Sequence, residues 1–358
     1  MLNIIRYCSK REMFRLAIGV VISLVLMSQG VYAESDLLKD DNLKRLAKNS
    51  VKKIVIPSFH VVFKTAEGGT SKSKKSFFGG NDPVAEANMV VSWPGVDKAM
   101  LQKVADEAYG EFARKLTDSG LEVVPLANVT GSEAYKKING TSVPVEDGGR
   151  ITVAPTGLSI YDPSAKMDPN GSLSMGIANT NSSGEAGVAK AVAGDMKGVG
   201  IARVVIVVAY GTFDKKASLS QDYLEKTAKA SIAFKPLLTI QPKVESALTS
   251  LTILSNYQEI PMYKMPSAYI AGDTSSVFIS SELQSGTIVA SLNETGLTTG
   301  EKAGEAAVGV LGALSNTKST YKKYEASIDA AAYEQALKDM VGKFAEQVAA
   351  RLKAAINK

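Results

Sequence analysis

The stretch that decides the fold is Ile201–Phe213, which reads IARVVIVVAYGTF. Its valines and isoleucines follow one another without alternation, which is typical of a strand buried on both faces of a sheet. Gly198 and Gly200 precede it and separate it from a Gly/Ala-rich segment, Glu185–Met196, which we predict to be a helix. The order of helix, glycines and buried strand is characteristic of proteins that pack helices against a sheet.

Two further segments predict long helices. Asp97–Ser119 ends at Gly120, a helix-terminating signal, and Ala330–Ile356 follows Asp329, a favourable N-cap. Both segments repeat apolar residues at steps of three and four, which places them on one helix face. In the first segment these residues are Leu101, Val104, Ala105, Ala108, Phe112 and Leu116. In the second they are Tyr333, Leu337, Met340, Val341, Phe344, Val348 and Leu352.

Shorter apolar runs predict the remaining strands. They are Lys53–Phe63, Asn88–Trp93, Leu121–Val124, Arg150–Ala154, Ala230–Ile240, Ser250–Ser255 and Tyr324–Ile328. Pro57 lies inside the first of them and predicts an edge, a bulge or the end of the strand. Val277–Leu283 and Thr287–Leu292 are predicted to form a hairpin. The expected fold class is α/β (α+β), with a mixed sheet packed by two long amphipathic helices.

The domain organisation follows from these elements. Residues 34–358 are expected to form one α/β domain, with residues 330–356 as its C-terminal helix; a division into two domains stays open. Residues 65–83 and 257–320 are expected to be loop or hairpin insertions. The first is rich in Gly, Ser and Lys, and the second begins with an irregular Tyr/Met/Pro segment.

The N-terminus has the pattern of a secretory signal peptide over residues 1–33. Four basic residues precede or flank an apolar run of 12 residues, Leu16–Met27, and Val31-Tyr32-Ala33 offers a cleavage site. An apolar run of that length is too short to span a bilayer comfortably. We therefore expect a cleaved signal and a periplasmic location, with association with the outer membrane left open.

Charge and cysteine content exclude several classes of function. The chain has 41 Lys and Arg against 36 Asp and Glu, and removing the four basic residues and one acid of residues 1–33 leaves a net charge of +2. So small a charge argues against nucleic acid as a partner. The only cysteine, Cys8, lies in the predicted signal, so the mature chain would have no disulfide, thiol nucleophile or cysteine metal ligand.

His60 is the only histidine of the chain and lies in the strand VKKIVIPSFHVVFKT, Val51–Thr65. Strand alternation places it on one face with Ser58 and Val62. A general base would need a nucleophile and an orienting group from elsewhere, and one histidine without cysteine cannot build an ordinary zinc site. We therefore interpret His60 as a structural, hydrogen-bonded residue near a sheet edge.

Other catalytic signatures are weak. Ser174 in GSLSMG misses the spacing of a nucleophile elbow, and Gly300-Glu301-Lys302 lacks the flanking residues of a P-loop. The S-x-x-K pattern, as at Ser71 and Lys74, has no accompanying partner motif. The sequence therefore predicts no catalytic residue, no metal ligand, no cofactor and no enzymatic activity.

Three segments are candidates for contact with partners. SKSKKSFFGG combines lysines with two phenylalanines, which suits anionic headgroups or a groove on another protein. Tyr257–Gly272 is rich in Tyr and Met, which are favoured at interfaces, and Ala303–Leu314 is apolar and rich in Gly and Ala. Each of these could instead pack within the domain. The candidate partner-binding residues are Lys72, Lys74, Lys75, Phe77, Phe78, Tyr257, Met262, Tyr263, Met265 and Tyr269.

Several of these segments, taken in order, resemble the curli-secretion CsgG family. They are IVIPSF, the helix that ends before Gly120, LEVVPL, ARVVIVV, GTIVAS and the C-terminal helix. The TolB N-terminal type of α/β domain is also similar. The resemblance implies a non-enzymatic envelope domain that assembles with other proteins at the outer membrane. Members usually carry a lipid on an N-terminal cysteine, whereas Glu34 occupies that position here, and no functional residue is carried over.

The sequence thus predicts an exported protein that binds rather than catalyses. Its expected role is an accessory or structural component of an outer-membrane assembly, such as a secretion system. Its expected partners are other envelope proteins, in an oligomeric assembly. Two alternatives are a periplasmic hydrolase that uses two carboxylates and a small-molecule binding protein.

Overall fold

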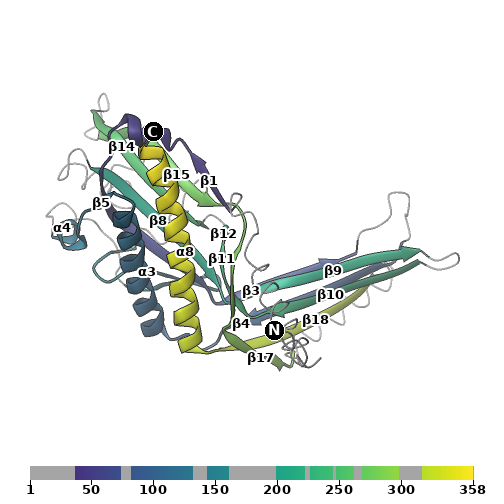
Figure 1. The fold of residues 1–358 in the computed structure, drawn as a ribbon. Helices are drawn as coiled ribbons and strands as arrows, with labels where there is room; N and C mark the ends of the chain where they lie inside the picture. The colour runs from purple at the N-terminus through teal and green to yellow at the C-terminus, as the bar shows by residue number, and fades with distance from the viewer. Residues whose placement is uncertain are drawn as a thin grey trace, which may run out of the picture. The chain divides into compact units, whose positions relative to one another are not determined.

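The computed structural model describes residues 37–73, 82–131, 143–160, 199–221, 226–244, 247–261, 268–297 and 317–357. These residues form a mixed α/β fold, as the sequence predicts, but with several sheets in place of the single mixed sheet expected, and Leu38–Lys358 make up one compact unit. The largest sheet and the helices packed on it are called the body. A second sheet and one long hairpin are called the extension (Figure 1).

The body contains a ten-stranded mixed sheet built around β8 (Gly200–Ala209) and β2 (Lys53–Lys64). These two strands are parallel, and all ten residues of β8 are buried, because helices cover one face of the sheet and further residues cover the other. The sheet order is β1-β15-β14-β8-β2-β7-β6, with β11 beside β8 and β16, and β5 beside β2. The remaining strands of this sheet are β1 (Leu38–Asp41), β5 (Glu122–Val123), β6 (Val145–Asp147), β7 (Arg150–Val153), β11 (Leu237–Gln241), β14 (Ser250–Pro261), β15 (Ala268–Ile279) and β16 (Leu283–Ile288).

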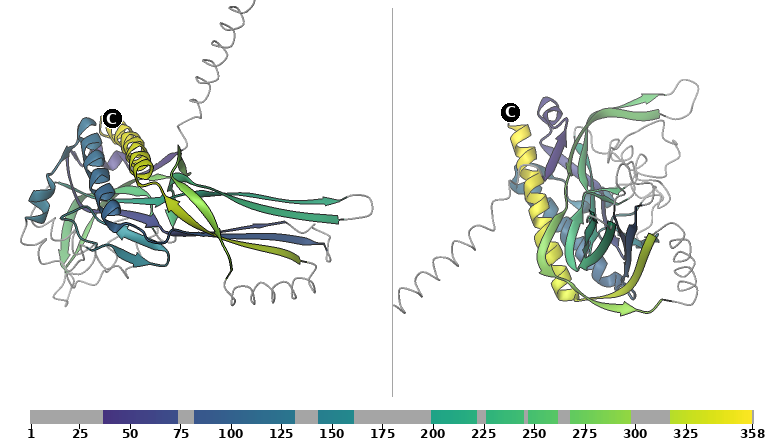
Figure 2. Two further views of the ribbon diagram at one scale, coloured as in Figure 1. Left: turned by 90° about the horizontal axis from the view of Figure 1, so that it is seen from below. Right: turned by 90° about the vertical axis from the view of Figure 1, so that its right-hand side faces the viewer.

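Two long helices, α3 (Lys98–Asp118) and α8 (Ala330–Ile356), lie side by side on one face of this sheet (Figures 1 and 2). Asp97 caps α3 by accepting from the backbone N–H groups of Ala99 and Met100, and Asp329 caps α8 by accepting from Ala332. Gly120 follows α3 with φ of 97°, a conformation that glycine adopts at little cost. Two short helices, α2 (Lys44–Lys48) and α4 (Leu126–Thr130), complete the described helices.

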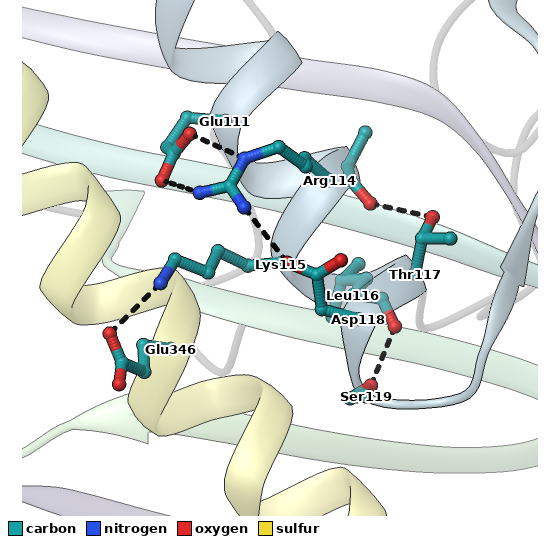
Figure 3. Close-up of polar contacts among 9 residues, drawn as sticks. Glu111, Arg114, Lys115, Leu116, Thr117, Asp118, Ser119 and Glu346 are labelled. Atoms are coloured by element: carbon teal, nitrogen blue, oxygen red, sulfur yellow. Dashed lines mark hydrogen bonds and ion pairs between the residues drawn. The ribbon is translucent and has the colours of Figure 1, made fainter.

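The two long helices are joined to each other and to the sheet by aromatic packing and surface ion pairs. The ring centroids of Phe59 on β2 and Phe112 on α3 are 5.9 Å apart, and the same distance separates Phe112 from Phe344 on α8. Figure 3 shows the polar side of this contact, where Lys115 Nζ lies 3.0 Å from Glu346 Oε2. Exposed pairs of this kind contribute little, so the buried apolar stripes hold the layer together.

The extension has two parts. A four-stranded sheet has the order β17-β18-β4-β3, and a separate two-stranded hairpin of β9 and β10 packs on β3 and β4. The strands are β3 (Ala66–Lys72), β4 (Val84–Ser92), β9 (Thr212–Gln221), β10 (Lys226–Lys235), β17 (Ala290–Thr295) and β18 (Thr317–Ile328). They run away from α3 and α8 (Figures 1 and 2). A further two-stranded ladder pairs β12 (Lys243–Val244) with β13 (Ala247–Leu248).

Several sequence predictions need correction. Residues 66–72, expected to be part of a loop, form β3, because this Gly-rich segment pairs with β4 over seven residues. The hairpin expected around residues 284–286 does not form; β16 runs through these residues and pairs with β11 instead. Pro236 divides the single strand expected over residues 230–240 into β10 and β11. Much of the irregular segment expected at residues 257–272 belongs to the regular hairpin of β14 and β15.

Other predictions are confirmed or lie outside the described residues. The C-terminal helix spans the predicted residues, and Pro57 lies at a bulge between Val55 and Ser58 in the pairing of β2 with β8. The predicted helix at 185–196 and the apolar segment 303–314 are outside the described residues. So are residues 1–36, which contain the predicted signal peptide.

Candidate interaction surface

The extension is continuous with the body because strands pass from one to the other with one or two residues between them. We call these linking residues the joint: Thr65, Tyr210, Gly211, Pro236 and Val289. The backbone N–H of Val289 donates to the carbonyl of Pro236 at 2.9 Å, and that of Trp93 donates to Thr65 at 2.7 Å. These hydrogen bonds hold neighbouring linking segments together, so the joint is an ordered part of the fold.

Aromatic rings fill the interior of the joint. The ring of Tyr210 lies 6.0 Å from that of Trp93 and 5.6 Å from that of Phe234, and Phe213 lies 5.1 Å from Phe234, all between centroids. Trp93 also contacts Tyr333 of α8 at 5.5 Å. Burial raises the pKa values of both Tyr210 and Tyr333, so both phenols stay neutral. This cluster connects the hairpin to the helical layer of the body.

Close packing places the hairpin on β3. A Cβ atom at Gly69 would lie 2.6 Å from Ile232 Cδ1 and 2.7 Å from Phe213 Cγ, so only glycine fits between the two layers there. Ser71 lies two residues after Gly69 on the same face of β3, and its hydroxyl donates to the backbone carbonyl of Lys216 at 2.9 Å. The hairpin turns its apolar side chains toward this contact, while Asp214, Lys216 and Ser218 alternate onto the opposite face.

The other face of β3 and β4 is polar and internally paired. Lys72 Nζ lies 3.1 Å from Glu86 Oε2, and Asn88 donates to Glu86 Oε1 at 3.1 Å and contacts the Thr70 hydroxyl at 2.7 Å. The hydrogen bonds from Asn88 and Lys72 lower the pKa of Glu86. This face therefore presents fixed, satisfied polar groups to solvent.

The edges of the two sheets differ. In the body, β1, with the sequence LKDD, and β6, with the sequence VED, end the main order of strands; both are short and charged, which discourages pairing with another strand. Among the described strands, the two-residue β5 and the six-residue β16 also pair with one strand each. In the extension, β9 and β10 pair through ten consecutive residues without a bulge, and neither contains proline. Among the described residues, β3, β9, β10 and β17 each pair with one strand only. The extension thus offers long regular edges.

The hairpin is also basic. Its two strands contain five lysines and one aspartate: Lys215, Lys216, Lys226, Lys229, Lys235 and Asp214. Lysines on strands suppress indiscriminate pairing, because the charges repel a like-charged edge. A surface that meets this hairpin must therefore supply compensating acidic groups.

The structure describes only part of the predicted partner-binding set. Lys72 lies at the end of β3 and pairs with Glu86, and Tyr257 and Tyr269 lie on β14 and β15. The other seven candidates are outside the described residues: Lys74, Lys75, Phe77, Phe78, Met262, Tyr263 and Met265. The sequence reasoning placed residues 230–235 of β10 in a strand but missed most of β9 and the pairing of the two strands, although the alternation of small apolar and polar residues was the available signal.

His60 is buried inside the sheet rather than near an edge, because β2 lies between β8 and β7. Neither ring nitrogen makes a hydrogen bond of ordinary geometry with a described residue. Burial, and then the nearby charge of Arg203, lowers the pKa of His60 to about 3, while the backbone of Ser159 opposes the shift. A neutral ring that is 1% exposed is poorly placed for acid–base catalysis.

Two further observations concern small ligands. A depression of about 390 Å³ lies beside the joint and is lined by Trp93, Lys98, Glu146, Asp147 and Arg150, among others. Its charges already pair with one another, Lys98 with Glu146 and Arg150 with Asp147. Within the described ranges, no three His, Cys, Asp or Glu side chains gather closely enough to hold a metal ion. No described helix is both long and apolar enough to cross a membrane.

Comparison with known proteins found no matching family model, no matching curated protein and no matching solved structure. The function is therefore inferred from the residues and their geometry.

Proposed function

We propose that this protein is an exported, non-enzymatic component of an envelope assembly, and that it acts by binding other proteins through its extension. The observation that carries the proposal is the contrast between the two sets of sheet edges. Two of the body's end strands, β1 and β6, have four and three residues, whereas β9 and β10 pair over ten residues without a bulge or a proline. An edge of that length is suited to pairing with another chain, and the five lysines of the hairpin restrict such pairing to a chain that supplies acidic groups.

The chemistry of the extension supports a specific partner. A strand that adds to an edge gains main-chain hydrogen bonds, and side chains then decide which strand is accepted. The lysines of β9 and β10 favour a partner with acidic groups, either another envelope protein or a differently charged surface of another copy of this chain. In this proposal the two long amphipathic helices α3 and α8 support the mixed sheet, and the insertions into the α/β fold carry the binding.

The proposed location rests on the sequence. Residues 1–33 have the order of basic, apolar and small residues that an export signal requires, which supports a periplasmic protein associated with the outer membrane. The resemblance to the curli-secretion family supports an accessory or structural role in a secretion system.

Extraction of membranes with a mild detergent, followed by affinity isolation of the tagged full-length chain, tests the proposal. We expect a complex of higher mass that dissociates when Lys215 and Lys216 are both changed to Glu. A matched control changes Lys338 and Lys343, two lysines of α8, to Glu and should leave the complex intact. A chain recovered only as a monomer in the soluble periplasmic fraction would contradict the proposal.

A further inference from the structure

Glu67 is a buried carboxylate between the two layers of the extension. It is the second residue of β3, and it is 6% exposed. Its Oε2 lies 3.1 Å from Lys64 Nζ, whereas its Oε1 makes no hydrogen bond with any described residue. An ionised carboxylate normally needs several donors when it is buried, so this group is incompletely stabilised.

The surroundings of Glu67 favour its neutral form. Burial raises its pKa most strongly, the ammonium group of Lys64 lowers it, and the negative charge of Glu282 raises it again. Because Glu282 and Glu67 carry like charges, the single ammonium of Lys64 cannot fully compensate both. The carboxyl group of Glu67 therefore binds a proton more tightly here than it would in water.

The charged and titratable neighbours come from each element around Glu67. Lys64 of β2 also donates to Gln241 Oε1 of β11 at 3.2 Å, and it lies beside Arg150 of β7, which pairs with Asp147. Glu282, just before β16, accepts hydrogen bonds from Thr212 and Gln284 at 3.3 Å each. Tyr210 of the joint donates its hydroxyl to the carbonyl of Val91 at 2.9 Å and stays neutral.

The position of Glu67 connects its charge to the hairpin. Glu67, Gly69 and Ser71 alternate onto the same face of β3, and the latter two contact the hairpin directly. Thr65 is the single residue that separates β3 from β2, so Glu67 is also next to the joint. Separation of the hairpin from β3 would expose this face of the strand, and with it the carboxylate, to water.

We propose that Glu67 is a proton-sensitive latch that controls how tightly the hairpin of β9 and β10 is held on β3. When Glu67 is protonated, it lies in the layer as a neutral group and the contact is closed. When Glu67 is ionised, it requires water molecules and the ion pair with Lys64 to stabilise its charge, and the contact between the hairpin and β3 loosens. This inference concerns the isolated chain and does not rest on the proposed function.

The direction of the effect follows from linkage. In the closed state the pKa of Glu67 is raised, and in an open, hydrated state it returns toward the ordinary value for glutamate. The closed state is therefore stabilised as pH falls through the raised pKa and is weakened above it. Each unit of difference between the two pKa values changes the opening equilibrium by about tenfold.

Trp93 is a built-in reporter of this latch. It is the only tryptophan of the chain, it donates its backbone N–H to Thr65, and its ring contacts Tyr210. Fluorescence of the full-length protein, recorded across pH, should show a transition whose midpoint lies above the ordinary pKa of glutamate. Glu67→Gln should abolish the transition, and Glu282→Gln should move it to lower pH because a like charge has been removed.

Hydrogen exchange of the β9 and β10 amides, corrected for the intrinsic rate at each pH, provides the second measurement. At neutral pH the Glu67→Gln variant should exchange more slowly than the wild type, by about tenfold for each unit of raised pKa. Glu86→Gln, on the opposite face of the same sheet, is the matched control and should keep the wild-type transition and exchange. A transition that persists in Glu67→Gln, or hairpin exchange unchanged by it, would overturn the latch.

Discussion

Gly211 of the joint has no room for a side chain, so its substitution by alanine tests the packing of the joint. A Cβ atom at this position would lie 2.0 Å from Phe234 Cζ, 2.3 Å from Phe234 Cε1 and 2.7 Å from the backbone oxygen of Lys235. Ordinary contacts between carbon atoms are about 3.5 to 4.0 Å. The Gly211→Ala variant therefore requires the Phe234 ring to withdraw by about 1.5 Å, the shortfall from that contact distance.

The ring cannot withdraw freely. Phe234 is buried and is packed against Tyr210 on one side and Phe213 on the other, and the carbonyl of Lys235 belongs to the backbone. Overpacking of this kind costs about 1 to 3 kcal/mol, and the upper part of that range applies because backbone must move as well. Alanine recovers about 0.4 to 1 kcal/mol by restricting the unfolded chain. The expected net loss is about 2 kcal/mol of unfolding free energy.

Urea unfolding measures this loss, and two glycine variants serve as controls. Gly286→Ala meets no atom within 4 Å, so its effect should stay within about 0.5 kcal/mol. Gly110→Ala, inside α3, also meets nothing and should stabilise by about 0.5 to 1 kcal/mol, because alanine favours helix. If Gly211→Ala is as stable as the Gly286→Ala control, the packing described for the joint is wrong.

Three further predictions concern the body. The pKa of His60 is about 3 in the folded protein and ordinary in the unfolded chain, so the wild type loses about 1.4 kcal/mol of unfolding free energy per pH unit as the pH falls below about 6.5. The His60→Gln variant should lack this pH-dependent loss, which urea midpoints at pH 7 and pH 5 measure. Binding should stay intact in this variant. His60→Asp, which buries a carboxylate at the same site, should instead prevent soluble expression. Asp329→Ala should cost about 1 kcal/mol, measured by thermal unfolding, because Ala332 loses its capping acceptor; an unchanged melting temperature would exclude that role for the cap.

The elements that sequence reasoning found share strong, local patterns. β8 is a continuous apolar run, and α3 and α8 repeat apolar residues over many turns between recognisable caps. These signals depend only on neighbouring residues. The body was therefore largely predictable.

The extension was not predictable in the same way, because its strands are defined by distant partners. β3 has the sequence AEGGTSK, which reads as a loop, yet its Gly69 is required by contact with Ile232, more than 160 residues later. One strand of the body was hidden in the same way, since β16 pairs with β11 rather than with the strand that follows it. The latch joins Lys64, Glu67 and Glu282, whose proximity no local pattern contains.

The most direct test of assembly through the extension is cross-linking at single cysteines. The chain's only cysteine is Cys8, so in a Cys8→Ser background a cysteine introduced on β9 or β10 is unique. Ser218→Cys and Ser231→Cys lie on the exposed face of the hairpin, and Ala354→Cys on the exposed side of α8 is the control. With a short cross-linker that carries one maleimide and one photoreactive group, applied to intact cells and activated by light, we predict discrete covalent products of higher mass from the two hairpin cysteines and none from the control. Hairpin cysteines that yield only monomer, as the control does, would contradict assembly through the extension.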